Sequence, residues 1–413
     1  TAGFISGYPG SPLGGYDHAL HQASNFLKDK QIVFQPGINE DLAATALHGT
    51  QQTTLVDNPK HDGVFGIWFG KGPGVDRSGD ALKHGNYAGS SKHGGVLALA
   101  GDDHAAKSST TAHQSDHAFI HFGMPILNPA TVQDYIDFGL MGIAMSRYSG
   151  CWIGMKCITD TVESAASVDI GFKRFKPVLP DISDEEGDLH LQWGYMPAMS
   201  ESRLYKQRLP AAQAFARANS IDRVIFQGQK KLAIVTSGKA YLDVRQSLDE
   251  LGLSENLCSK IGISLYKVGM VWPLEPKNIS NFVNGNEEVL VVEEKRPIVE
   301  DQLMKYLYNE KDRPLIIGKK DEFGNDLVPS EGELSPSQIA LIIAKRIKGL
   351  SLNIELESKV EEIETLLANI NSAPVSDLFR LPSFCAGCPH NTSTKVPDDS
   401  FAFGGIGCHG MAT

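Results

Sequence analysis

Residues 4–15 read FISGYPGSPLGG, a short apolar run that leads directly into a loop rich in glycine and proline. The run at 4–6 predicts a β-strand, and residues 16–28 have the spacing of a helix. This order of apolar run, turn and helix predicts an α/β domain built on a parallel sheet. The order recurs, with further strand-like runs at 32–35, 64–69, 96–100 and 152–158 and a helix over 40–52.

A second alternating region follows, with apolar runs at 232–238, 261–268 and 289–294. Three strands that alternate with helices predict a small doubly wound domain. The acidic stretch at 177–188 is typical of a solvated surface loop. The sequence therefore predicts a domain at 1–200, a linker at 201–229, a domain at 230–348, a linker helix within 349–379 and a cysteine-containing segment at 380–413.

Length and composition limit the function. A chain of 413 residues predicts two to three domains, and 41% apolar with 21% charged residues is typical of a globular protein. A net charge of −11 argues against nucleic acid as the main partner. The sequence has neither an apolar run near the roughly 20 residues that cross a bilayer nor a signal peptide, so we expect no membrane partner. Six cysteines in so long a chain favour a reducing cytoplasm over a disulfide framework. Both ends of the sequence look cut, and we expect a fragment of a longer polypeptide.

Cysteines gather near the end of the chain. Residues 384–391 read FCAGCPHN and residues 404–410 read GGIGCHG, so three of the six cysteines lie in this window: Cys385, Cys388 and Cys408. Two thiolates in a Cys-x-x-Cys turn and a third on a glycine-rich turn suit an iron–sulfur cluster or a zinc ion. The residues alone leave both metals open.

Glu40 and Ser11 are the other candidates for chemistry. Glu40 begins the 40–52 helix directly after a Pro-Gly turn, where a carboxylate can simply favour the helix start. The alternative is a buried acid that holds a proton on a heterocyclic nitrogen. Ser11 lies in the 7–15 loop, which is either a plain turn or a ligand site at the carboxyl end of a parallel strand.

A polar loop at 101–117 and three further cysteines can each be explained by a structural role instead of a chemical one. The stretch 101–117 is rich in histidine, aspartate and serine, which indicates metal ligation or, more simply, a hydrogen-bonded loop that lines a cofactor or subunit interface. Residues 71–78 lack the spacing of a phosphate-binding P-loop. Cys151, Cys157 and Cys258 lie in or near apolar runs and are predicted to be small buried hydrophobes.

The motifs at 7–17, 37–45, 101–109 and 384–391 with 405–411, taken together and in this order, give a specific resemblance. The chain resembles the thiamine-diphosphate-dependent 2-oxoacid:ferredoxin oxidoreductases, most closely the fused bacterial indolepyruvate ferredoxin oxidoreductases. The resemblance implies transketolase-like, doubly wound parallel-sheet domains. It makes 1–200 the pyrimidine-binding domain, 230–348 a transketolase C-terminal-like domain and 380–413 the start of the diphosphate-binding domain.

The resemblance also implies roles for individual residues. Glu40 matches the glutamate that binds N1′ of the aminopyrimidine and favours the tautomer that deprotonates the thiazolium ring. Pro9 and Gly10 fall in the cofactor-binding loop, and Ser11 falls where related enzymes carry a hydroxyl near the substrate carboxylate. The set Cys385, Cys388 and Cys408 matches three of the four ligands of a [4Fe–4S] cluster.

The implied reaction converts a 2-oxoacid, coenzyme A and oxidised ferredoxin into an acyl-CoA, CO₂ and reduced ferredoxin. An aryl pyruvate such as indolepyruvate is the expected substrate, and a homo-oligomer the expected assembly. The Mg²⁺–diphosphate motif and the fourth cluster cysteine are expected beyond residue 413, so this stretch alone should be inactive. Two alternatives stay open: another thiamine enzyme, such as a decarboxylase or a transketolase-like protein, and a non-catalytic subunit with a structural zinc site.

Overall fold

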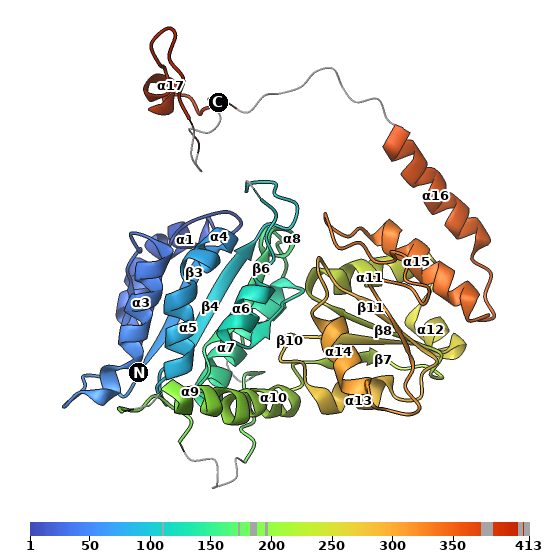
Figure 1. The fold of residues 1–413 in the computed structure, drawn as a ribbon, viewed down its shortest axis with the longest axis horizontal. Helices are drawn as coiled ribbons and strands as arrows, with labels where there is room; N and C mark the ends of the chain where they lie inside the picture. Colours follow the sequence, from blue (N-terminus) through green and yellow to red (C-terminus); the bar gives the residue numbers. More distant parts are fainter. Residues whose placement is uncertain are drawn as a thin grey trace. The chain divides into compact units, whose positions relative to one another are not determined.

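The computed structural model of the chain divides into two compact units, Thr1–Glu361 and Glu362–Thr413. The structure describes residues 1–109, 111–171, 174–181, 188–194, 197–372, 383–403 and 408. The first unit contains two largely parallel sheets, drawn from blue to teal and from yellow-green to orange in Figure 1. No helix in the described ranges is both long enough and apolar enough to cross a membrane.

The first sheet has seven strands in the order β10-β5-β6-β4-β3-β1-β2, and only β10 runs antiparallel to its neighbour. Each apolar run predicted in the first half of the sequence forms one of these strands. Their bounds are β1 (Ala2–Gly7), β2 (Ile32–Phe34), β3 (Val64–Lys71), β4 (Val96–Asp102), β5 (Ile126–Leu127), β6 (Ile153–Ile158) and β10 (Met270–Trp272).

Helices cover both faces of this sheet because side chains alternate along each strand. In β4, Val96, Ala98 and Ala100 pack in one core with α3, α5 and α6. Leu97 and Leu99 pack in another core with α1, α7 and the later helix α10 (Leu209–Ala218). The predicted α/β, doubly wound fold is confirmed. The helical elements of this half are α1 (Tyr16–Gln22), α2 (Ser24–Asp29), α3 (Glu40–Gln51), η1 (Thr53–Leu55), α4 (Gly72–Arg77), α5 (Gly79–Ala88), α6 (Asp116–Phe122), α7 (Val132–Ser149) and α8 (Thr159–Val162).

The second sheet has five strands in the order β12-β11-β8-β9-β7, parallel except for β7. The three strands predicted here are β8, β9 and β11, and the short edge strands β7 and β12 extend the sheet. The elements are β7 (Arg223–Phe226), β8 (Leu232–Ser237), α11 (Gly238–Glu250), α12 (Glu255–Ile261), β9 (Ile263–Val268), α13 (Pro276–Val283), β11 (Glu288–Val292), α14 (Val299–Leu307), β12 (Leu315–Ile317), α15 (Pro336–Gly349) and α16 (Glu357–Ser372).

The segment predicted as a linker at 201–229 differs from that prediction. It holds the end of α9 (Pro197–Arg203), a π-helical turn (Leu204–Arg208), α10 (Leu209–Ala218) and β7. Buried Leu204 and Phe215 pack into the core of the first sheet. The side chain of Arg208 is completely buried and donates hydrogen bonds to backbone carbonyls of Leu189 and of residues 86–88. The segment is therefore part of the first compact unit.

Strand β10 connects the two halves of the chain. It follows β9 of the second sheet but pairs with β5 of the first (Figure 1). The crossing is fixed by Asp222, whose carboxylate accepts hydrogen bonds from the backbone N–H groups of Gly269 (2.8 Å) and Met270 (3.0 Å). Its second oxygen, Oδ2, is buried without a hydrogen-bond partner among the described residues. Burial, with a smaller effect of Glu275, raises the pKa of Asp222 to about 7.

Asp222→Asn should make stability less dependent on pH. An unfolded aspartate ionises near pH 4 and the folded one near pH 7, so the wild type loses stability as pH rises through this interval. Asparagine keeps the acceptor oxygen and does not ionise. We expect the free energy of unfolding of the variant to exceed that of the wild type by a margin that grows from pH 5 to about pH 7 and then levels off at about 4 kcal/mol.

The measurement is urea denaturation of both proteins at pH 5, 6, 7 and 8. Asp249→Asn, which alters an exposed aspartate of α11, is the control and should show no such trend. A difference in the free energy of unfolding between Asp222→Asn and the wild type that stays constant over this pH range would contradict the raised pKa of Asp222.

Candidate active site

Glu40 is the first residue of α3, but it does not cap the helix. That role belongs to Asn39, whose side chain accepts a hydrogen bond from the Leu42 N–H at 2.8 Å. The backbone carbonyl of Glu40 accepts a hydrogen bond from the indole Nε1 of buried Trp68 at 2.9 Å, which fixes the start of α3 against β3. The half-buried Glu40 carboxylate has no hydrogen-bond or ion-pair partner in the part of the chain that the structure describes.

The Glu40 side chain lies against backbone that only glycine permits. A Cβ atom at Gly74, in α4, would lie 2.6 Å from Cγ and 2.8 Å from Oε1 of Glu40. Any larger residue at position 74 would therefore push the carboxylate away. This cradle, together with the lack of a protein partner, leaves a carboxylate available to a bound group, and it fits an acid that contacts the nitrogen of a heterocyclic cofactor.

The loop 7–15 lies at the same edge of the sheet. Its start is fixed by hydrogen bonds from Tyr8 N to Phe69 O (3.1 Å) and from Gly37 N to Gly7 O (2.9 Å). Gly10 and Ser11 are half-buried, and Pro9 is exposed. The structure thus places the predicted residues Pro9, Gly10, Ser11 and Glu40 around the carboxyl ends of β1 and β3, where ligands bind in open α/β sheets.

Lys71 is a residue of this edge that the sequence analysis did not single out. It ends β3, and its stem lies against Gly10, where a Cβ would approach Lys71 Cδ to 3.0 Å. The Lys71 ammonium donates a hydrogen bond to the carbonyl of Ser108 at 3.2 Å. In the sequence, the one feature that could have pointed to Lys71 as a site residue is its position directly after an apolar strand and before a Gly-Pro-Gly turn.

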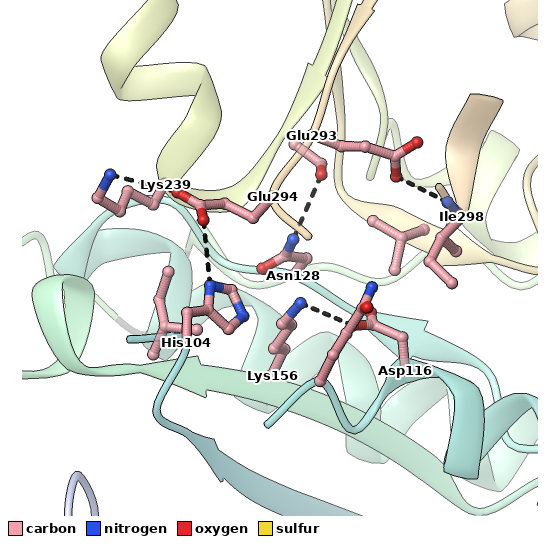
Figure 2. A pocket seen from close by; sticks show the side chains of 12 residues that line it. His104, Asp116, Asn128, Lys156, Lys239, Glu293, Glu294 and Ile298 are labelled. Carbon is pink, nitrogen blue, oxygen red and sulfur yellow. Dashed lines mark hydrogen bonds and ion pairs between the residues drawn. The ribbon is translucent and has the colours of Figure 1, made fainter. Parts of the chain in front are cut away.

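The polar stretch 101–117 turns toward the second sheet, where it forms a buried polar joint defined by His104, Asp116, Lys156, Lys239 and Glu294. His104 Nδ1 lies 3.3 Å from the Glu294 carboxylate, Lys239 lies 3.3 Å from the same carboxylate, and Lys156 pairs with Asp116 at 2.6 Å (Figure 2). Burial would raise the pKa of Glu294, but the hydrogen bond and charge of His104 and the charge of Lys239 outweigh it and lower that pKa to about 2.

The cavity inside this joint is too small for a substrate. Its volume is about 10 Å³, room for roughly one water molecule. Figure 2 shows His104, Asn128 and Lys156 around the same small space, and His104 Nε2 and Asn128 Oδ1 have no hydrogen-bond partner within the described ranges. The joint therefore connects residues at the carboxyl ends of strands from both sheets, and we assign it no chemistry.

The three cysteines near the end of the chain are exposed or half-buried. The Cys388 N–H donates to the carbonyl of Cys385 at 3.0 Å, so both thiols sit on one tight turn, which Gly387 closes with φ of +77°. Cys388 Sγ also lies 3.2 Å from Nδ1 of His390, in α17 (His390–Ser393). Cys408 is exposed, and its neighbours in sequence are outside the described residues.

No three histidine, cysteine, aspartate or glutamate side chains of the described residues come together as a metal site. The arrangement therefore fits two thiolate ligands on one turn but not a complete cluster. The other cysteines behave as predicted: Cys151, Cys157 and Cys258 are buried, and burial raises the thiol pKa of Cys151 to about 11 and that of Cys258 to about 12.

Comparison with known proteins supports the resemblance. Residues 222–374 match the indolepyruvate oxidoreductase domain. The indolepyruvate oxidoreductase subunit IorA of Methanothermobacter thermautotrophicus is 24% identical over 396 residues, which cover 94% of this chain and 56% of the relative. The chain is similar to the indolepyruvate oxidoreductase subunits. It spans about half the length of the curated relatives it matches.

Solved structures agree with the fold of this chain. The 2-oxoglutarate:ferredoxin oxidoreductase from Magnetococcus marinus, solved with 2-oxoglutarate, coenzyme A and succinyl-CoA bound, matches 84% of this chain and 62% of its own at a TM-score of 0.56 and 14% identity. A split-gene transketolase, an inactive β4 tetramer, matches 85% of this chain and 93% of its own at a TM-score of 0.50 and 14% identity. These likenesses confirm the transketolase-like α/β fold.

Proposed function

We propose that the chain is part of a thiamine-diphosphate-dependent enzyme that oxidises a 2-oxoacid to an acyl-CoA, with ferredoxin as the electron acceptor. Two findings support the proposal: the relatives are named for indolepyruvate oxidation, and the fold matches a 2-oxoglutarate:ferredoxin oxidoreductase. An aryl pyruvate is the proposed substrate class. We further propose a cytoplasmic homo-oligomer that binds thiamine diphosphate with Mg²⁺.

The placement of Glu40 carries the proposal. Thiamine diphosphate, when bound, supplies the carbanion that adds to the carbonyl carbon of the 2-oxoacid. The chain's own contribution is a carboxylate that has no partner among the described residues and is held against Gly74 at the carboxyl end of the sheet. In this role Glu40 holds a proton at a ring nitrogen of the aminopyrimidine, while Pro9 and Gly10 border the cofactor and Ser11 faces the substrate carboxylate.

Glu40→Gln should abolish most of the activity in the full-length protein. Glutamine fills the same space but cannot exchange a proton, so kcat should fall by about 100- to 10,000-fold. The assay is reduction of a viologen dye with 2-oxoacid, coenzyme A and thiamine diphosphate. Asp41→Asn changes the neighbouring carboxylate on the same helix start and should leave kcat nearly unchanged. Full turnover by Glu40→Gln would refute the cofactor assignment.

We also propose that Cys385, Cys388 and Cys408 are ligands of a [4Fe–4S] cluster. The turn that holds the first two thiols supports this assignment, since adjacent thiolates on one turn suit a single metal centre. The chain has no described set of ligands that would complete the cluster, so no step of the reaction is derived through it.

Replacing Cys385 with serine should lower the iron and acid-labile sulfide of anaerobically purified full-length protein. Removal of one thiolate weakens the cluster, and broad visible absorption should decrease in proportion. Cys258→Ala removes a buried thiol that serves no metal and should leave iron content unchanged. A colourless wild-type protein with stoichiometric zinc would instead support a structural zinc site.

A further inference from the structure

Lys71 is held in a defined position at the candidate site. It is the last residue of β3, and β3 lies between β1 and β4 in the sheet. Its aliphatic stem rests on the backbone of Gly10, the residue directly before Ser11. The Glu40 carboxylate lies against Gly74, three residues after Lys71. The stem of Lys71 therefore lies beside the loop that carries Ser11, and Lys71 ends the strand that leads to the Gly74 backbone beneath Glu40.

The charge of Lys71 has no opposite charge to pair with among the described residues. An ammonium has three N–H donors, and the structure gives this one a single acceptor, the Ser108 carbonyl at 3.2 Å. No carboxylate forms an ion pair with Lys71 within the described ranges. Two other lysines near this edge differ in this respect: Lys107 pairs with Glu333 at 2.9 Å, and Lys156 is buried against Asp116.

We propose that Lys71 binds the carboxylate of the 2-oxoacid substrate, a proposal that rests on the function proposed above. A 2-oxoacid brings a full negative charge into the site, and the ammonium of the half-buried Lys71 side chain is available to receive it. In the complex, the ammonium donates a charge-assisted hydrogen bond to the carboxylate, which is stronger than its bond to a neutral carbonyl. Ser11 adds a neutral donor beside it.

This role predicts a particular kinetic signature. The carboxylate keeps its charge from binding until it leaves as CO₂, so Lys71 stabilises the bound acid and the transition state that precedes loss of CO₂ to the same extent. Loss of an interaction made equally in the ground state and the transition state raises KM and leaves kcat nearly unchanged. Lys71 would also make the site prefer acids over their neutral analogues, which a purely structural lysine would not do.

The test uses the full-length holoenzyme with Lys71→Gln and Lys71→Arg. For Lys71→Gln we expect KM for an aryl pyruvate to rise by about 10- to 100-fold, with kcat within about threefold of the wild type. Arginine keeps the charge and should restore part of the affinity. Lys60→Gln, an exposed lysine ahead of β3, is the matched control and should leave both constants unchanged.

A second readout separates carboxylate binding from a structural effect. The inhibition constants of a non-reactive aryl 2-hydroxy acid and of its methyl ester are compared in wild type and Lys71→Gln. Weaker inhibition by the acid alone supports the proposal, and equal weakening of both, or unchanged KM, overturns it. If thiamine-diphosphate-dependent oxidation of 2-oxoacids is absent in the wild type, the proposed function fails and the role of Lys71 fails with it. If the wild type shows this activity but the Lys71 variants have the same KM as the wild type, the role of Lys71 is wrong and the proposed function stands.

Discussion

Strand β10 is the constraint on which the first compact unit depends. A strand that comes after β9 of one sheet pairs with β5 of the other, so the two sheets cannot part without breaking backbone hydrogen bonds. Asp222 holds the crossing by accepting from two consecutive N–H groups, and Asn128 N bonds to the carbonyl of Gly269 at the same place. The halves of the chain that look like separate α/β domains in sequence are therefore one packed unit.

The buried polar joint is a consequence of this connection. Loops from the carboxyl ends of β4, β8 and β11 meet, and polar residues that follow these strands pair with one another: His104 with Glu294, and Lys239 with the same carboxylate. A buried charge is tolerated only when it is paired or hydrogen-bonded, and the joint meets most of this demand internally. This explains why the polar stretch after β4, which resembles a metal site in sequence, is occupied by contacts within the chain.

The candidate active site has the opposite character. Glu40 contacts the backbone of Gly74, three residues after Lys71 at the edge of the first sheet, yet the described residues provide no charged partner for either side chain. Close contact with Gly74 and Gly10 fixes both side chains through packing, without using their charges. Charged groups that are positioned but not neutralised are what a site for a cofactor and an anionic substrate needs, and here they occur at the sheet edge where such ligands bind.

The sequence by itself determined the strands, the helix that begins at Glu40, the burial of Cys151, Cys157 and Cys258, and the resemblance to the oxidoreductases, because apolar periodicity and short motifs are local properties. It could not determine that 201–229 packs as helices, since the burial of Arg208 depends on carbonyls more than 100 residues away in sequence. Nor could it show that Lys71 rests on Gly10, or that the 101–117 loop pairs with Glu294. Each of these depends on which segments the two sheets bring together, and only the tertiary structure decided that.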